Sequence, residues 1–341
     1  MTIRFGIAGT GWVAGEYVRS IEGHPDAEFG GMYSRQPQYA EGRLKEWGVQ
    51  ARLYGTFEEM AEDPAIDAIV LCSTPEVRPE QAIVASRRGK HLVIEKPVAL
   101  ERGSLAAMGE AIRSNGVKTV TSFVLRWNPL FETVKSLLKD DAIGHVFMAE
   151  TDYWHDIGPR YVQYRWSSRK DLGGSSILSA GCHAVDALRY FAGEVEEVKA
   201  YSGRTSPASE SGYEFDPNVM AIMKLRNGGI AKVSSSLECR TPYKMNIRLL
   251  GDKGTLLNNQ LFSHKFPGQT DYATIPTILP DSGDVTHHPF AFEIADLITA
   301  IHSGGTTRCD FEDACRTMEL CFAIDDSAAS GETIRLPEVR K

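Results

Sequence analysis

Short apolar runs alternate with amphipathic stretches along the first third of the chain. The apolar runs predict strands, and the stretches with an apolar position at every third or fourth residue predict helices. The predicted strands are Ile3–Ala8, Glu28–Tyr33, Ala68–Ser73, His91–Glu95 and Lys118–Ser122. The predicted helices are Trp12–Ile21, Pro37–Trp47, Thr56–Ala61, Pro79–Arg88 and Leu100–Asn115. This rhythm predicts a doubly wound parallel sheet.

The pattern changes after about Phe123. Helical periodicity is present at Leu130–Leu138, Ser176–Phe191, Pro289–Ile301 and Phe311–Ser330. Extended runs are present at Val146–Trp154, Val195–Ser202, Asn218–Leu225, Gly229–Leu237, Lys244–Leu250 and Thr255–Asn258. Asn227-Gly228 and Asp252-Lys253-Gly254 are typical hairpin turns, so they predict an open antiparallel sheet with helices.

A chain of 341 residues exceeds what one hydrophobic core usually holds, so we expect two domains. The patterns place an α/β domain at residues 1–123 and an α+β domain at residues 124–341. The net charge of -8 excludes nucleic acids and anionic membranes as expected partners, because both require a basic face. The apolar runs are too short to span a bilayer.

The six cysteines form no C-x-x-C pair, and several lie in apolar runs, which predicts buried, reduced thiols. The first predicted strand begins at Ile3, where a signal peptide would otherwise lie. Both features predict a cytoplasmic protein. We expect no metal site, because His287 and His288 are adjacent, their side chains would point apart, and no third ligand lies at a useful spacing.

A glycine-rich loop follows the first strand and opens a helix: Gly9, Thr10, Gly11, Trp12, Val13, Ala14. Gly9 would make the tight turn, Gly11 would let a pyrophosphate approach the backbone, and Ala14 would allow close packing of helix and strand. Amide groups at the helix start would face the phosphate charge. The loop therefore predicts dinucleotide binding, with a purely structural glycine turn as the alternative.

The residues after the second strand bear on the choice of cofactor. An NAD enzyme usually places an acid there to bind the ribose hydroxyls, but this chain has Met32, Tyr33, Ser34 and Arg35. Ser34 and Arg35 are suited to bind a 2′-phosphate, one by a hydrogen bond and one by charge. NADP is therefore favoured over NAD, with Arg35 as an ordinary exposed arginine in the alternative interpretation.

Lys96 follows the fifth predicted strand, at the sheet edge where ligands of such sheets bind. Pro97 disfavours a helical conformation at Lys96, so the side chain is expected to project from the strand end. A lysine near a bound nicotinamide is suited to exchange a proton with an alcohol. The alternative is a solvated surface charge.

Ser179, His183 and Asp186 are spaced to share one face of a helix. A carboxylate one turn from an imidazole would orient it for acid–base work or for binding an oxygen. A merely structural pair is the alternative. Aromatic residues cluster just upstream, and Tyr153 and Trp166 are the candidates to stack on the C–H face of a polyol.

Taken together, these motifs resemble the glucose-fructose oxidoreductase, inositol dehydrogenase and rhizopine-catabolism (Gfo/Idh/MocA) family. The matching pieces are the Gly9–Ala14 loop, Ser73-Thr74-Pro75, Glu95-Lys96-Pro97, Arg126-Trp127-Asn128-Pro129, Gly173-Gly174, Gly181-x-His183-x-x-Asp186 and His288-Pro289-Phe290-x-Phe292-Glu293.

The resemblance implies a Rossmann domain followed by an open antiparallel sheet. It implies that Lys96 and His183 are catalytic. It also implies that the cofactor is lined by Ser73, Thr74, Pro75, Glu95 and Arg126. It further implies an oligomer, a homodimer or homotetramer, formed through the face of the second-domain sheet. Two residues depart from the family pattern: Ser179 stands where an aspartate is common, and Arg78 stands where a histidine is often found.

The predicted reaction is the reversible oxidation of a secondary alcohol on a sugar or cyclitol. Lys96 would take the hydroxyl proton, while His183, steadied by Asp186, would orient the oxygen. For that, Lys96 and His183 must reach one substrate. Two alternatives remain open: an NAD-dependent glycosidase, and a non-catalytic sensor that binds NADP.

Overall fold

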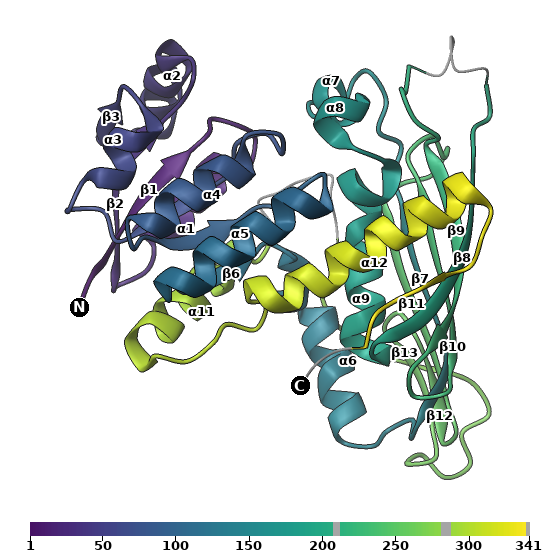
Figure 1. The fold of residues 1–341 in the computed structure, drawn as a ribbon. Coiled ribbons are helices and arrows are strands. Elements are labelled where there is room, and N and C mark those ends of the chain that lie inside the picture. The colour runs from purple at the N-terminus through teal and green to yellow at the C-terminus, as the bar shows by residue number, and fades with distance from the viewer. Residues whose placement is uncertain (207–211, 281–287, 339–341) are drawn as a thin grey trace. The chain divides into compact units, whose positions relative to one another are not determined.

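The computed structural model describes residues 1–206, 212–280 and 288–338, and Figure 1 shows its fold. Contacts divide the chain into two compact units. The first unit comprises Met1–Val124 and Val285–Cys315, and the second comprises Leu125–Asp284 and Arg316–Lys341.

The described part of Val285–Cys315 thus belongs to the first unit, although the sequence pattern placed it in the second domain. Packing explains why. The Phe290 ring lies 4.7 Å from the Tyr17 ring, centroid to centroid. The Phe311 backbone amide donates a 2.9 Å hydrogen bond to Thr119 Oγ1. These contacts join residues far apart in the sequence, so no local pattern reveals them.

The first unit contains the predicted parallel sheet. Its strands, in spatial order, are β3 (Arg52–Tyr54), β2 (Ala27–Tyr33), β1 (Ile3–Ala8), β4 (Ala68–Leu71), β5 (His91–Ile94) and β6 (Thr119–Thr121). All neighbours pair in parallel. Its helices are α1 (Ala14–Glu22), α2 (Pro37–Trp47), α3 (Phe57–Glu62), α4 (Arg78–Arg87), α5 (Arg102–Asn115) and α11 (Phe290–Ser303). The doubly wound parallel sheet is confirmed; β3 was not predicted, because it is only three residues long.

The second unit contains a nine-stranded sheet. In spatial order its strands are β14 (Ala273–Thr274), β13 (Gln260–Ser263), β12 (Gly254–Leu257), β11 (Lys244–Gly251), β7 (Val146–Trp154), β10 (Ile230–Ser236), β9 (Asn218–Leu225), β8 (Val195–Gly203) and β15 (Ile334–Arg335). Its helical segments are α6 (Pro129–Lys139), α7 (Tyr164–Ser167), α8 (Lys170–Gly173), the π-helical turn η2 (Ile177–Gly181) and α9 (Cys182–Ala192). The 3-10 turn η1 (Val124–Trp127) and helix α12 (Phe311–Ser330) each cross a boundary between the units.

The two predicted hairpins are confirmed, because β9 pairs with β10 and β11 with β12 in antiparallel fashion. The antiparallel pairing predicted for this sheet has one exception. Strands β7 and β10 pair in parallel, with Ile230 opposite Met148. These two strands are joined by a long connection that includes helices and two further strands, and a crossover of this kind permits parallel pairing.

One face of this sheet is covered and the other is open. Helix α9 packs against β7, β10 and β11. Burial alternates along β9: Val219, Ala221 and Met223 are buried, while Met220 and Ile222 are exposed. The alternation follows from the two-residue period of a strand with one face on a core.

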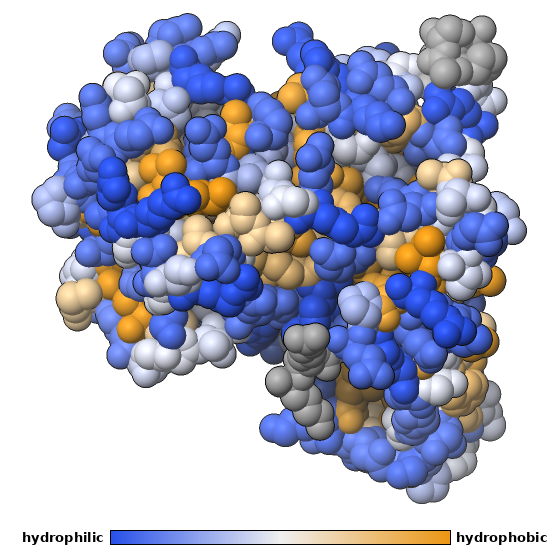
Figure 2. Space-filling view, in the orientation of Figure 1, coloured by the Kyte–Doolittle hydropathy of each residue, from blue (hydrophilic) through white to orange (hydrophobic). Residues whose placement is uncertain are grey.

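All six cysteines are free; four are buried and two are half-buried. The predicted reduced thiols are therefore consistent with the packing. Within the described residues, no helix is both long and apolar enough to cross a membrane. On the face drawn in Figure 2, hydrophilic residues predominate and hydrophobic residues form separate patches.

Candidate functional site

The loop after β1 has the conformation expected of a phosphate loop. Gly9 has a φ of +111°, and a Cβ there would lie 2.8 Å from the carbonyl carbon and oxygen of Cys72 and from the Ser73 amide nitrogen. Only glycine fits this close approach of two backbones. Gly9 is thus required by the fold itself.

Gly11 differs from Gly9. A Cβ at Gly11 would have one described neighbour within 4 Å, the Cys72 carbonyl oxygen at 3.8 Å. Nothing in the first unit therefore demands glycine, and the residue is exposed just before α1. A pyrophosphate approaching the start of α1 would need the space that a Cβ fills, so the loop fits a dinucleotide.

Strand order places these residues at the usual ligand-binding edge. Strand β1 lies between β2 and β4, so the chain reverses its direction of winding there. In open parallel sheets, ligands bind at this switch point, beyond the carboxyl ends of the strands. Gly9, Arg35, Ser73 and Lys96 all follow strands that end at this edge.

Arg35 contacts the loop after β4. Its guanidinium donates to Thr74 Oγ1 at 3.1 Å and lies 3.3 Å from Glu76 Oε1, and Thr74 donates to the same Glu76 oxygen at 2.6 Å. The side chain of Arg35 is 60% exposed. Glu76 was not identified from the sequence; an acid two residues after the Ser73-Thr74 pair was the available signal. The Ser34 hydroxyl accepts a 3.2 Å hydrogen bond from the Gln36 amide.

Lys96 is held through its backbone. Its amide donates a 3.1 Å hydrogen bond to Glu95 Oε2, and the Tyr17 hydroxyl donates to Glu95 Oε1 at 2.8 Å. Both oxygens of a buried carboxylate are thereby occupied. The Lys96–Pro97 peptide bond is cis. The structure thus places Glu95 as a support behind the candidate catalytic lysine.

The support extends deeper into the first unit. Tyr17 and Ser122 hydroxyls lie 2.8 Å apart, and Ser122 donates to Glu293 Oε2 at 2.9 Å. Complete burial raises the pKa of Glu293 well above its ordinary value, and the nearby Glu95 raises it further. The Glu293 carboxyl therefore keeps its proton to higher pH. Tyr17, Ser122 and Glu293 had no assigned role in the sequence.

In the second unit, His183 belongs to an aromatic cluster formed by Tyr153, His155, Tyr161, His183 and Tyr243. The Tyr153 and His183 rings are stacked, with centroids 5.8 Å apart and 20° between planes. Tyr243 contacts Tyr153 at 5.3 Å and His155 at 5.5 Å, and His155 contacts Tyr161 at 4.9 Å. Tyr243 was missed in the sequence because it lies about ninety residues beyond Tyr153.

The cluster presents neutral hydroxyl groups. Burial is the main cause that raises the pKa of Tyr153 well above its ordinary value, and burial also raises the pKa of Tyr161. Each phenol therefore remains a hydrogen-bond donor at neutral pH. Tyr153 is itself buried as part of this packed cluster. Trp166 lies half-buried in α7, outside the cluster.

The helix predicted for 176–191 is divided in two. Residues Ile177–Gly181 form the π-helical turn η2, which leads into α9. A π-helical turn is wider than an α-helical turn, so Ser179 lies in a turn of different geometry from the α-helix that carries His183 and Asp186. Ser179 is buried, with 5% of its surface exposed. Such turns occur frequently at functional sites.

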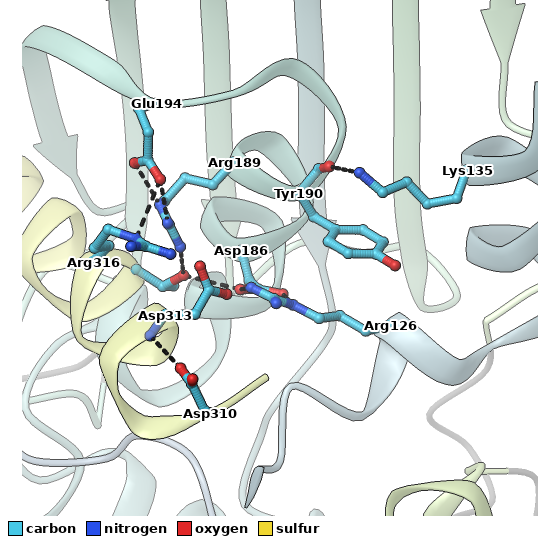
Figure 3. A network of polar contacts seen from close by, with 10 residues as sticks. Arg126, Lys135, Asp186, Arg189, Tyr190, Glu194, Asp310, Asp313 and Arg316 are labelled. Carbon is cyan, nitrogen blue, oxygen red and sulfur yellow. Dashed lines mark hydrogen bonds and ion pairs between the residues drawn. The ribbon is translucent and has the colours of Figure 1, made fainter. Parts of the chain in front are cut away.

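Asp186 contacts an arginine. Arg126 Nε donates to Asp186 Oδ2 at 2.8 Å and its terminal nitrogen donates to Oδ1 at 2.6 Å, while Thr317 donates to Oδ1 at 2.9 Å (Figure 3). Both charged side chains are 3% exposed. In the described part of the chain, the hydrogen bonds of this carboxylate thus go to Arg126 and Thr317. The sequence pattern paired this carboxylate with the His183 imidazole, whereas the structure describes a two-bond pair with Arg126, whose guanidinium fork matches the carboxylate geometry.

The same network continues along α9 (Figure 3). Arg189 donates to Thr317 Oγ1 at 2.6 Å and forms a two-bond pair with Glu194 at 2.6 and 3.0 Å. The Arg126 guanidinium also lies 4.9 Å from the centre of the Tyr190 ring. Arg126 was expected beside the cofactor, and the structure shows its guanidinium in this buried network. His287, considered as a metal ligand, lies outside the described residues.

Two family models match the chain. The model "Oxidoreductase family, NAD-binding Rossmann fold" matches residues 3–123. The model "GFO/IDH/MocA C-terminal domain" matches residues 131–257.

Individual relatives match over nearly the whole length. D-xylose 1-dehydrogenase (NADP(+)) 2 of Haloferax volcanii is 26% identical over 334 residues, which cover 97% of this chain and 99% of the relative. Inositol 2-dehydrogenase of Rhizobium meliloti is 25% identical over 341 residues, which cover 98% of this chain and 100% of the relative. The solved structure of levoglucosan dehydrogenase in complex with NADH and levoglucosan has a TM-score of 0.90 at 20% identity. The match covers 99% of this chain and 100% of that structure's chain. That likeness shows a shared fold.

Proposed function

Since the chain belongs to the Gfo/Idh/MocA family of NAD(P)-binding oxidoreductases, we propose that it interconverts a secondary alcohol and a ketone on a sugar or cyclitol. The observation that carries this proposal is Lys96, which follows β5 at the ligand edge of a dinucleotide-binding sheet, with its backbone held by Glu95. Relatives named for xylose and inositol dehydrogenation support the substrate class.

The roles proposed for the chain's own residues follow from their chemistry. Lys96 accepts the hydroxyl proton while the carbon is oxidised, and returns it in the reverse direction. His183 orients the substrate oxygen, and the aromatic cluster around it packs against C–H groups. Gly9, Thr10, Gly11, Trp12 and Val13 would hold the pyrophosphate. A bound nicotinamide supplies the hydride acceptor or donor.

The experiment that tests this function is a screen. The purified protein is mixed with sugars, cyclitols and 3-keto sugars, each with NAD(H) and NADP(H), and the absorbance of the reduced nicotinamide is followed. Turnover of at least one polyol is expected. Cleavage of a glycoside without net cofactor turnover would instead identify a glycosidase, and tight cofactor binding without any turnover would identify a sensor.

We propose that the cofactor is NADP(H), bound at its 2′-phosphate by Ser34 and Arg35. The ion pair that Arg35 makes with Glu76 is exposed, and such pairs contribute about 0–1 kcal/mol. A phosphate can therefore replace Glu76 as the partner of Arg35 at little cost. In a variant without Arg35, the negative charge of Glu76 would repel the 2′-phosphate.

Arg35→Ala is expected to raise the Kd of NADPH by roughly one to two powers of ten, because a charge-assisted bond is worth about 1.5–3 kcal/mol. The Kd of NADH should change little. Isothermal titration calorimetry measures both. Arg43→Ala, which removes another exposed and paired arginine of the first unit, is the control. Tighter binding of NADH than NADPH by the unaltered protein would contradict the proposal.

We further propose that the open face of the second-unit sheet binds a second copy of the chain, in a homodimer or a homotetramer. Met220, Ile222 and Ile230 expose 55%, 60% and 54% of their surface on it. Ile222 and Ile230 border a groove of about 540 Å³ over β7, β8, β9 and β10. Paired charges such as Lys224 and Glu197 flank it, which suits a self-complementary interface.

Ile222→Glu is expected to convert the oligomer to monomers at micromolar concentration, because it would bury a carboxylate at the interface. Light scattering coupled to size-exclusion chromatography gives the mass. Ile278→Glu makes the same change at another exposed isoleucine, 62% exposed, and should leave the mass unchanged. A monomeric unaltered protein would refute the interface.

A further inference from the structure

Arg78 is a buried arginine at the first position of α4. Only 3% of its surface is exposed. Burial lowers the pKa of its guanidinium, while the carboxylate of Glu95 acts in the opposite direction. A cation is seldom buried so deeply without a specific partner, because removing it from water is costly. Its hydrogen bonds therefore require an explanation.

Both terminal nitrogens of Arg78 donate to backbone carbonyls. One donates to Ser73 at 2.6 Å, and the other donates to Pro97. Ser73 lies in the loop that follows β4, and Pro97 follows Lys96 in the loop after β5. A single guanidinium thus joins the two loops that flank the ligand edge of the sheet.

Each loop is also held by a hydrogen bond to a helix. The Ser73 hydroxyl donates to Gln81 on α4, and Glu95 is held by Tyr17 on α1. Each loop is thus attached to a different helix. The planar fork of Arg78, with donors at fixed spacing, sets their separation directly. A lysine ammonium is a point donor and lacks this fork.

We propose that Arg78 is a positioning residue, which sets the place of Lys96 by holding the Ser73 and Pro97 carbonyls in one guanidinium fork. The inference rests on the proposed function, since it assigns Lys96 to proton transfer. The loop carrying Ser73 and Thr74 would move together with the Lys96 loop. Both the bound nucleotide and the lysine would therefore lose their alignment without Arg78.

Two substitutions separate the fork from the charge. Arg78→Lys keeps a cation beside Glu95 but reaches one carbonyl, and Arg78→Met removes both the fork and the charge. Arg87→Met, an exposed arginine at the end of the same helix, is the matched control. For each protein we would measure the melting temperature, the Kd of NADPH and NADH, and kcat and KM for a polyol that the screen identifies.

We expect kcat to fall about tenfold in Arg78→Lys and about a hundredfold in Arg78→Met, because misplacing a reacting group by about 1 Å can cost two orders of magnitude. KM should change much less than kcat. The nucleotide Kd should rise by about threefold to tenfold in both variants. Arg87→Met should match the unaltered protein in every measurement.

Folded Arg78 variants whose kcat and nucleotide Kd stay within twofold of the unaltered values would overturn the inference and leave Arg78 a purely stabilising residue. If Arg78→Met does not fold, Arg78→Lys decides alone by the same criterion. If the unaltered protein oxidises no polyol, the proposed function has failed. The nucleotide Kd then decides on Arg78 separately, with a rise of threefold or more supporting it and an unchanged value refuting it.

Discussion

Replacing Lys96 with methionine is expected to lower kcat by about two to four orders of magnitude, the usual contribution of a general acid–base group. Methionine keeps most of the apolar stem of the side chain and removes the amine that accepts the proton. The backbone bond from residue 96 to Glu95 persists in the variant, because it comes from the main-chain amide. The nucleotide Kd is therefore expected to change little.

Steady-state and single-turnover kinetics with the polyol found by the screen measure this effect, and calorimetry measures the nucleotide Kd. Lys45→Met, which alters an exposed lysine of α2 in the same unit, provides the control and should retain full activity. A Lys96→Met protein with near-normal kcat would end the proposed mechanism. Loss of nucleotide binding would instead assign Lys96 to the cofactor alone.

Arg126→Met is expected to destabilise the protein by about 3–5 kcal/mol, the usual consequence of removing one partner of a buried ion pair. Asp186 is only 2% exposed, and the variant would leave this buried carboxylate without its guanidinium partner. At about 2–4 °C per kcal/mol, the melting temperature should fall by roughly 6–20 °C. Urea denaturation followed by circular dichroism gives the free energy of unfolding.

The chain offers a matched control for this variant. Arg169 binds Asp171 with the same two-bond geometry, at 2.9 and 2.6 Å, but their side chains are 51% and 56% exposed. Arg169→Met should lower the free energy of unfolding by no more than about 1 kcal/mol. The double variant Arg126→Met/Asp186→Leu should be more stable than Arg126→Met, since it leaves no unpaired buried charge. If Arg126→Met and Arg169→Met lower the free energy of unfolding equally, burial of the Arg126–Asp186 pair has no stabilising role.

Much of the local structure could be predicted from the sequence. Helices at Pro37–Trp47 and Phe311–Ser330 and strands at Val146–Trp154 and Asn218–Leu225 have the predicted bounds. Hydrophobic periodicity and turn chemistry act between near neighbours, so the sequence records them directly. The parallel sheet and the phosphate loop at Gly9 follow from the same kind of signal.

Only the tertiary structure decided which distant segments meet. It pairs β7 with β10 in parallel, returns the helix Phe290–Ser303 to the first unit, and joins Arg126 to Asp186 across sixty positions. Arg78 illustrates the reason. Its position in the sequence marked it as a departure from a family pattern, but its role depends on two carbonyls on separate loops. Contacts of this kind are selected by the packing of the whole unit, because a buried polar group takes whichever partner the fold brings within reach.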